Sequence, residues 1–229
     1  IGLVRRLGGA GPPPVPEEPI LLRTAVAVCV RDEAMAEVLP PLARLLDGLA
    51  PWGDRFALAI LSDTTDPARA AAEEAAVAAF AAGQPPGAVL YRRRTRNEGY
   101  KAGNVMDFMD HHADGLDLMI LLDADSEMAP GTALRLVRSM QRDPRLGILQ
   151  APIIGRDGAA PFGRLFNAGH RAGGQTWVLG QDWWQGDEGP FWGHNAALRI
   201  APFRRHCRLL PLPDGSHILS HDHVEAARM

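Results

Sequence analysis

Short apolar runs that alternate with helical stretches constrain the fold of this chain most. Runs rich in aliphatic and β-branched residues occupy residues 24–30, 56–63, 88–94 and 118–122, and a stretch of helical character follows each one. Near-continuous apolar strands are typical of a parallel sheet buried on both faces, and parallel strands need a crossover connection between them. The alternation therefore predicts an α/β fold: a mostly parallel central sheet with helices on both faces.

The helices between these runs are predicted from their caps and breakers. In the first, at residues 34–50, the pair Pro40–Pro41 is expected to bend or restart the helix. The Ala-rich second helix is expected to take Asp66 as its N-cap and to end at Gly83. The third is expected to start near Gly103.

The second half of the chain has a looser pattern. It predicts a helix at 130–143, a strand at 147–152, a helix at 162–179, an aromatic and Gly-rich loop at 181–195, a strand at 196–200 and two short helices near 202–207 and 220–229. The stretch at 1–22 contains the Pro/Gly-rich segment GGAGPPPVPEEP and is predicted to be a linker. Because the chain begins without methionine and ends within a helical pattern, it is expected to be a fragment of a longer protein.

Composition excludes several classes of function. A formal net charge of −3 gives no basic footprint for nucleic acid, and none is expected as a partner. Two cysteines, Cys29 and Cys207, are not expected to form a disulfide framework or a four-ligand zinc site. No apolar run approaches the roughly 18 residues that a membrane span requires.

Acidic residues follow two of the predicted strands. Asp63 ends the second, and Asp123 and Asp125 follow the apolar run LMILL. Ligands of parallel sheets bind beyond the carboxyl ends of the strands. If the D-x-D pair continues the extended chain, both carboxylates point the same way and could share Mg²⁺ or Mn²⁺. A solvated turn with two incidental acids is the alternative.

Candidate cations and bases lie elsewhere in the sequence. Lys101 is expected just before a helix start, where an anion such as a diphosphate is favoured. The arginines at 92–94 and 96 would add to this attraction or simply be solvated. In the run His221–His223 a histidine metal site is possible, but a single general base, Asp222, is the more economical interpretation. The tryptophans at 183, 184 and 192 are either core residues or a sugar platform.

Five motifs together resemble the family 2 glycosyltransferases. In chain order they are LSD at 61–63, KAGN at 101–104, LLDADS at 121–126, FWGHNA at 191–196 and LSHDHVEA at 219–226. Within that family the chain is similar to the membrane enzymes that make the β-glucan backbone of osmoregulated periplasmic glucans. The resemblance covers residues 23–229.

The resemblance implies a GT-A fold that transfers glucose from UDP-glucose to a glucan acceptor with inversion, using Mg²⁺ or Mn²⁺. It implies a nucleotide-sugar half at 23–152 and an acceptor half at 153–229. By their motif positions, Asp63 would contact the uridine, Lys101 the diphosphate, Asp123 the ribose and metal, and Asp125 the metal. Asp222 would be the general base, and Trp192, Gly193 and His194 would line the acceptor sugar.

The sequence also departs from the family. Arg31 stands where a polar neutral residue usually ends the first strand, and the QxxRW motif of processive relatives does not occur. The membrane helices of relatives are expected outside this chain, which would place the domain at the cytoplasmic face of the bacterial inner membrane. Two alternatives stay open. One is a sugar-nucleotide-forming nucleotidyltransferase, disfavoured because VRDEAMAEV lacks a glycine-rich phosphate loop; the other is a non-catalytic UDP-sugar sensor.

Overall fold

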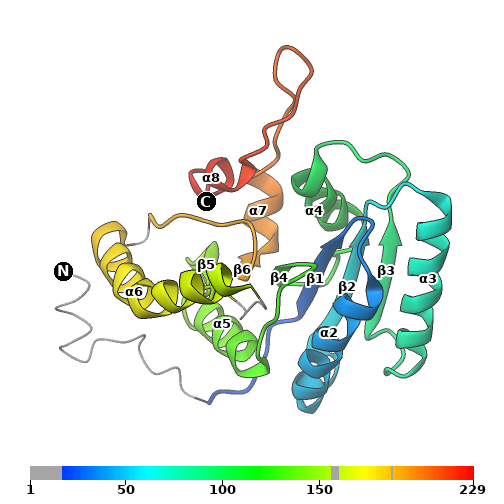
Figure 1. Ribbon diagram of the computed structural model, residues 1–229, viewed down its shortest axis with the longest axis horizontal. Helices are drawn as coiled ribbons and strands as arrows, with labels where there is room; N and C mark the ends of the chain where they lie inside the picture. The colour runs from blue at the N-terminus through cyan, green and yellow to red at the C-terminus, as the bar shows by residue number, and fades with distance from the viewer. Residues whose placement is uncertain (1–16, 156–159, 187) are drawn as a thin grey trace. The chain divides into compact units, whose positions relative to one another are not determined.

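A computed structural model describes residues 17–155, 160–186 and 188–229 (Figure 1). Most of the predicted linker, residues 1–16, lies outside this described part. The described residues divide into two compact units: one contains residues 17–150 and 191–229, and the other contains residues 151–155, 160–186 and 188–190.

A six-stranded sheet with the order β3-β2-β1-β4-β6-β5 forms the centre of the larger unit. Its strands are β1 Thr24–Val30, β2 Phe56–Ser62, β3 Val89–Arg93, β4 Leu118–Asp123, β5 Ile148–Gln150 and β6 Ala196–Arg199. The strands β1, β2, β3 and β4 run parallel to one another, whereas β6 runs antiparallel to both β4 and β5. The predicted mostly parallel sheet is confirmed, and β6 starts at the edge where β4 ends.

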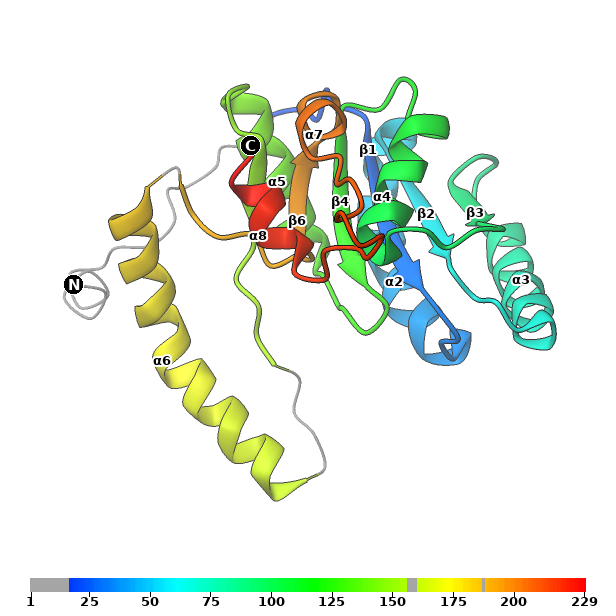
Figure 2. The same cartoon turned by 90° about the horizontal axis from the view of Figure 1, so that it is seen from above.

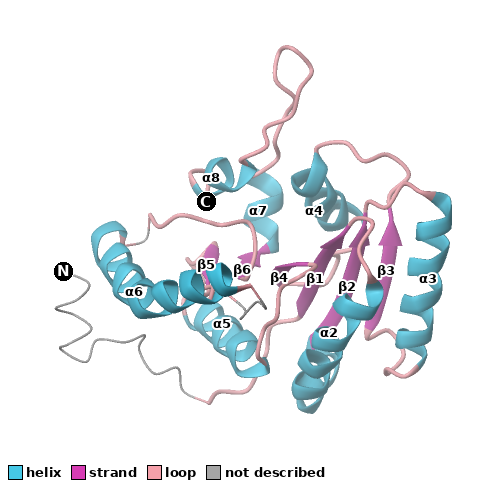
Figure 3. Cartoon of the chain, in the orientation of Figure 1, coloured by secondary structure: helices cyan, strands magenta, loops and turns pink. Residues whose placement is uncertain are grey.

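Helices cover both faces of this sheet (Figures 2 and 3). They are α2 Met35–Leu49, the 3-10 helix η1 Ala50–Arg55, α3 Pro67–Ala82, α4 Tyr100–His111, α5 Pro130–Arg142, α7 Ile200–His206 and α8 His221–Ala226. On β1, Ala25 and Ala27 pack with α4 and α7 in one core cluster. The residues between them, Val26 and Val28, are also buried. Because successive side chains of a strand point to opposite faces, both faces of β1 are covered, as its apolar sequence predicts.

The proline pair does not restart the first helix. α2 continues from Met35 to Leu49 with Pro40 and Pro41 inside it. Its apolar face, which includes Val38, Leu42 and Leu45, is buried. Burial of this face offsets the backbone hydrogen bonds that the two prolines cannot donate.

The predicted caps of the second helix are confirmed. α3 starts at Pro67 and is capped by Asp66, whose Oδ1 accepts a hydrogen bond from the backbone N–H of Arg69 at 2.8 Å. Gly83 is the C-cap residue.

Replacing Asp66 with alanine is expected to lower the free energy of unfolding by about 1 kcal/mol, because a backbone donor loses its acceptor. Urea denaturation of Asp66→Ala measures this. Asp66→Asn keeps a capping oxygen and serves as the matched control, so equal losses in the two variants would contradict the capping role.

The smaller unit contains one long helix, α6, which spans Pro161–Gln185. It extends beyond the predicted 162–179 and includes Trp183 and Trp184, so their assignment to a loop is wrong. Both tryptophans are exposed in the structure, which also excludes the core interpretation for them. Within the part of the chain that the structure describes, no helix is long and apolar enough to cross a membrane.

Candidate active site

Residues from three parts of the larger unit meet at the carboxyl edge of the sheet. Asp63 directly follows β2, and Asp123 is the last residue of β4. β6 starts at Ala196, paired with Leu121 of β4, so the preceding residue pair Gly193–His194 reaches the same edge. The edge predicted for a ligand therefore holds the residues predicted to bind it.

Lys101 is the centre of these contacts. Its ammonium donates hydrogen bonds to Asp123 Oδ1 and to the carbonyl oxygen of Gly193, the latter at 2.7 Å. The prediction that Lys101 precedes its helix is wrong, since α4 begins at Tyr100 and Lys101 lies in the first turn. Gly103 lies within the helix; a Cβ there would stand 1.9 Å from the carbonyl oxygen of Glu98. Only glycine allows this close approach, because it has no side chain. The prediction that the helix starts near Gly103 is therefore wrong.

The segment before β6 is held from two sides. His194 Nδ1 lies 3.6 Å from Asp123 Oδ2 and 3.5 Å from Ser126 Oγ. From β5, Gln150 donates to the carbonyl oxygen of His194 at 2.8 Å and accepts from the N–H of Trp192 at 3.1 Å. Sequence reasoning missed Gln150, although a polar side chain ending an apolar strand is a usable signal.

Asp222 lies in α8 against the same segment. Gly193 has φ +75°, and a Cβ on it would lie 3.6 Å from the Cβ of Asp222. Asp222 is half-buried, and its carboxylate has no hydrogen bond or ion pair with the residues that the structure describes. Its neighbour His221 is bonded instead to the buried Glu225, with Nδ1 and Oε2 3.0 Å apart. Asp222 therefore lies against Gly193, whose carbonyl oxygen accepts from Lys101, and its own oxygens have no partner among the described residues.

An exposed aromatic residue contacts the residue that follows Asp222. Trp192 is 43% exposed, and its ring lies 6.5 Å from the ring of His223 in an edge-to-face arrangement. An exposed indole is suited to packing against the C–H face of a sugar.

The D-x-D pair is not extended. β4 ends at Asp123, and the N–H of Ser126 bonds back to the carbonyl oxygen of Asp123 at 3.0 Å, which closes a turn. The expectation that both carboxylates point the same way because the chain is extended is therefore wrong. Asp125 lies in the turn and is exposed, without a hydrogen bond or ion pair to other described residues.

The carboxylates suit a hard cation only together with further oxygen ligands. Among residues 17–155, 160–186 and 188–229, no three acidic, histidine or cysteine side chains gather at metal-binding spacing. Mg²⁺ is commonly bound by one or two carboxylates and completed by substrate phosphates and water. Asp125 fits that pattern well, whereas Asp123 already has Lys101 as a partner.

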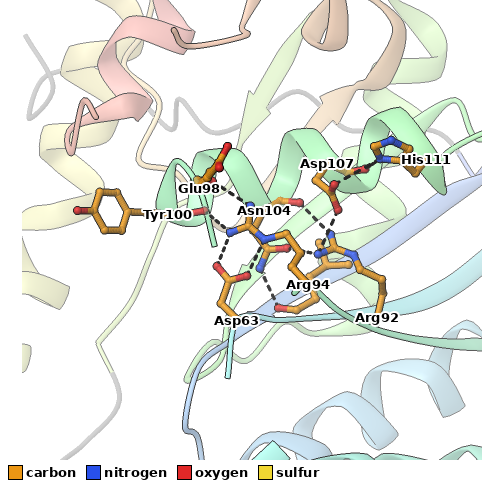
Figure 4. A network of polar contacts seen from close by, with 9 residues as sticks. Asp63, Arg92, Arg94, Glu98, Tyr100, Asn104, Asp107 and His111 are labelled. Carbon is orange, nitrogen blue, oxygen red and sulfur yellow. Dashed lines mark hydrogen bonds and ion pairs between the residues drawn. The ribbon is translucent and has the colours of Figure 1, made fainter. Parts of the chain in front are cut away.

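Asp63 has an arginine as its partner (Figure 4). Arg94 donates to both carboxylate oxygens, from Nε at 2.8 Å and from Nη2 at 2.6 Å. Both side chains are buried. Arg92 is likewise engaged by Asn104, at 2.7 Å to its Oδ1. The predicted basic cluster thus contains two structural arginines, and only Arg93 and Arg96 are exposed.

Two groups near this edge have altered acidity. Burial raises the pKa of the Cys29 thiol to about 12, so this cysteine, which is paired in register with Asp123, is a neutral thiol at pH 7. Burial also raises the pKa of Tyr91 to about 12, and its hydroxyl donates to Glu73 at 3.0 Å. Neither group is a nucleophile under ordinary conditions.

Comparison with known proteins decides the family. A family model described as glycosyl transferase family 2 matches residues 26–207. The chain belongs to this family. The resemblance inferred from the five motifs is confirmed.

Relatives and a solved structure agree with this assignment. The chain is 39% identical to glucans biosynthesis glucosyltransferase H of Cereibacter sphaeroides over 219 residues, covering 93% of this chain and 37% of that protein. It is also 39% identical to the protein of the same name from Vibrio cholerae over 230 residues, covering 96% and 32%. The chain thus spans about a third of the length of these relatives.

The fold has a counterpart in a mannosyltransferase from Pyrobaculum calidifontis, solved in complex with GDP-Man and Mn²⁺. The two share a TM-score of 0.58 at 16% sequence identity, covering 89% of this chain and 52% of that one. The predicted GT-A fold is confirmed. Family 2 membership also favours glycosyl transfer over the nucleotidyltransferase alternative.

Proposed function

We propose that this domain transfers glucose from UDP-glucose to a growing β-glucan with inversion at the anomeric carbon. The observation that carries the proposal is the series Asp123–Lys101–Gly193–Asp222, which connects a cation for a diphosphate, through Gly193, to a carboxylate that has no partner among the described residues. The named relatives favour glucose as the sugar and a glucan as the product.

In this proposal the donor lies over the carboxyl edge of the sheet. Asp63 contacts the uridine, Asp123 the ribose, and Lys101 the diphosphate. Lys101 is 24% exposed, so it is accessible to a ligand yet partly shielded from water. When UDP leaves, negative charge grows on its terminal phosphate, and a fixed ammonium stabilises that charge without reorganising.

Asp222 is proposed as the base. Its carboxylate takes the proton of the acceptor hydroxyl, whose oxygen forms the new bond to the anomeric carbon while the bond to UDP breaks. One displacement of this kind inverts the configuration and needs no enzyme nucleophile. Trp192, Gly193 and His194 are proposed to hold the acceptor sugar, with the Trp192 indole under its C–H face.

Asp125, with Asp123 beside it, is proposed to hold Mg²⁺ or Mn²⁺ together with the donor phosphates. Such an ion supplies electrostatic stabilisation of the leaving diphosphate. We further propose that the whole protein holds this domain at the cytoplasmic face of the bacterial inner membrane through segments outside the present chain, and that residues 1–22 link to them.

Isothermal titration tests the donor assignment. The chain is titrated with UDP, UDP-glucose and GDP-mannose, each with and without Mn²⁺. Binding of the two uridine nucleotides with little or no binding of GDP-mannose is expected. A preference for GDP-mannose, or no binding of any nucleotide, would contradict the proposed donor.

Asp125→Asn is expected to weaken UDP binding in the presence of Mn²⁺ by about tenfold or more, because an amide oxygen is a poorer ligand for a hard cation than a carboxylate. UDP binding without metal should change little. Glu127→Gln, two residues further along, is the matched control because Glu127 pairs with Arg44 on the surface. Unchanged Mn²⁺-dependent binding in Asp125→Asn would exclude Asp125 as a ligand.

A further inference from the structure

Arg94 connects two residues of the proposed donor site. Besides its two bonds to Asp63, it donates from Nη1 to the carbonyl oxygen of Glu98 at 2.9 Å and from Nη2 to that of Tyr100 at 3.0 Å (Figure 4). One guanidinium therefore joins the end of β2 to the start of α4. Lys101 directly follows Tyr100, so the same group fixes the backbone from which Lys101 extends.

The geometry excludes Arg94 as a direct phosphate ligand in this state. A guanidinium has five N–H donors, and four of them are used in these hydrogen bonds. The side chain is only 7% exposed. Its role must therefore be exerted through the groups that it holds.

The bidentate pairing fixes the orientation of the Asp63 carboxylate. Two parallel N–H···O bonds leave a planar fork little freedom to rotate. Asn97 adds a further restraint, since its Nδ2 donates to the carbonyl oxygen of Asp63 at 2.6 Å. An ionised carboxylate only accepts hydrogen bonds, so Asp63 in this orientation suits a base whose ring nitrogen carries a hydrogen. Uracil has such an N–H, whereas cytosine has an acceptor at the same position.

We propose that Arg94 is the positioning residue of the donor-nucleotide site, and that by orienting Asp63 and the first turn of α4 it sets both the affinity for UDP and the preference for uracil over cytosine. This inference rests on the proposed function, in which Asp63 contacts the base. In the sequence, Arg94 was one of four arginines expected either to attract phosphate or to be solvated. The inference gives it a different role, the orientation of the residues that contact the nucleotide.

Titration of this chain with UDP and CDP tests the proposal. Arg94→Lys keeps the charge but loses the fork, and Arg94→Gln loses both. The wild-type chain is expected to prefer UDP. Both variants are expected to bind UDP about tenfold more weakly or worse, because a charged hydrogen-bonding group is no longer oriented. Their ratio of UDP to CDP affinity should fall towards one.

Two further variants make the result specific. Arg96→Ala removes an exposed neighbour that is paired with Glu98, and it should leave both the UDP affinity and the ratio unchanged. Asp63→Asn replaces an acceptor with an N–H₂ donor of the same shape and is expected to move the preference towards CDP. This variant tests the base contact even if both Arg94 variants fail to fold, a failure that circular dichroism would detect.

The possible failures are distinguishable. Absence of nucleotide binding by the wild-type chain would overturn the proposed function and this inference with it. If the wild-type chain binds UDP and Arg94→Lys binds it with the same affinity and preference, only the role of Arg94 is wrong. Equal weakening of UDP and CDP would show that Arg94 supports packing alone, and it would overturn the positioning role. If Asp63→Asn leaves the preference for UDP over CDP unchanged, the positioning role of Arg94 is likewise overturned.

Discussion

Asp222→Asn is expected to lower the rate of glucosyl transfer by about a hundredfold to ten-thousandfold, the range over which a positioned general base contributes. The amide is isosteric with the carboxylate but cannot accept the proton of the acceptor hydroxyl. Asp222 has no described partner that the substitution would disrupt, so folding should be unaffected. The rate is measured with UDP-glucose and a β-glucan acceptor in the full-length protein.

Donor binding separates this outcome from a general defect. UDP affinity in Asp222→Asn should match that of the unmodified protein, because the donor contacts are assigned to other residues. Asp114→Asn is a suitable control for the loss of one negative charge, since the Asp114 side chain is 95% exposed. Normal transfer by Asp222→Asn would exclude Asp222 as the base. If the unmodified full-length protein binds UDP-glucose but transfers no sugar, the non-catalytic sensor would be the better interpretation.

The second large effect concerns stability. Asp63→Ala is expected to reduce the free energy of unfolding by about 3–5 kcal/mol, because it leaves the buried Arg94 guanidinium without a counter-charge. The carbonyl oxygens of Glu98 and Tyr100 would still accept from Arg94, which favours the lower end of this range. Equilibrium denaturation with urea, followed by circular dichroism, gives the value.

A double variant shows whether the pair is responsible. Asp63→Ala combined with Arg94→Met removes the stranded charge, so it should cost less than the sum of the two single substitutions. For comparison, Arg96→Ala breaks an exposed ion pair and is expected to cost at most about 1 kcal/mol. A loss below about 1 kcal/mol for Asp63→Ala, or simple additivity in the double variant, would be incompatible with a coupled buried pair.

The fold class followed from local properties of the chain. The apolar runs at 24–30 and 118–122 predicted buried strands, and they form β1 and β4. Asp66 before Pro67 predicted a helix start, and its side chain caps α3 there. Such features act over a few residues, so their consequences are readable in order along the sequence. The carboxyl edge was also predictable, because the acids follow parallel strands directly.

The sequence could not show how the edge residues pair. Lys101 contacts Asp123 and Gly193 across 22 and 92 positions of the chain, and Arg94 meets Asp63 across 31. No periodicity encodes such distances. The prediction of a helix start near Gly103 failed because it also depended on a tertiary contact. Glycine is required at this position because the carbonyl oxygen of Glu98 leaves no room for a side chain.

The sequence by itself thus determined the family, the parallel sheet and the candidate residues, since motifs and apolar periods are local. Only the tertiary structure decided which of these residues have partners. It buried Arg94 against Asp63, turned the chain after Asp123 so that Asp125 is exposed, and set Asp222 beside Gly193 with no hydrogen-bond partner for its carboxylate in the described part of the chain. The physical reason is that burial and the pairing of charges depend on chain segments that meet only after the sheet has formed.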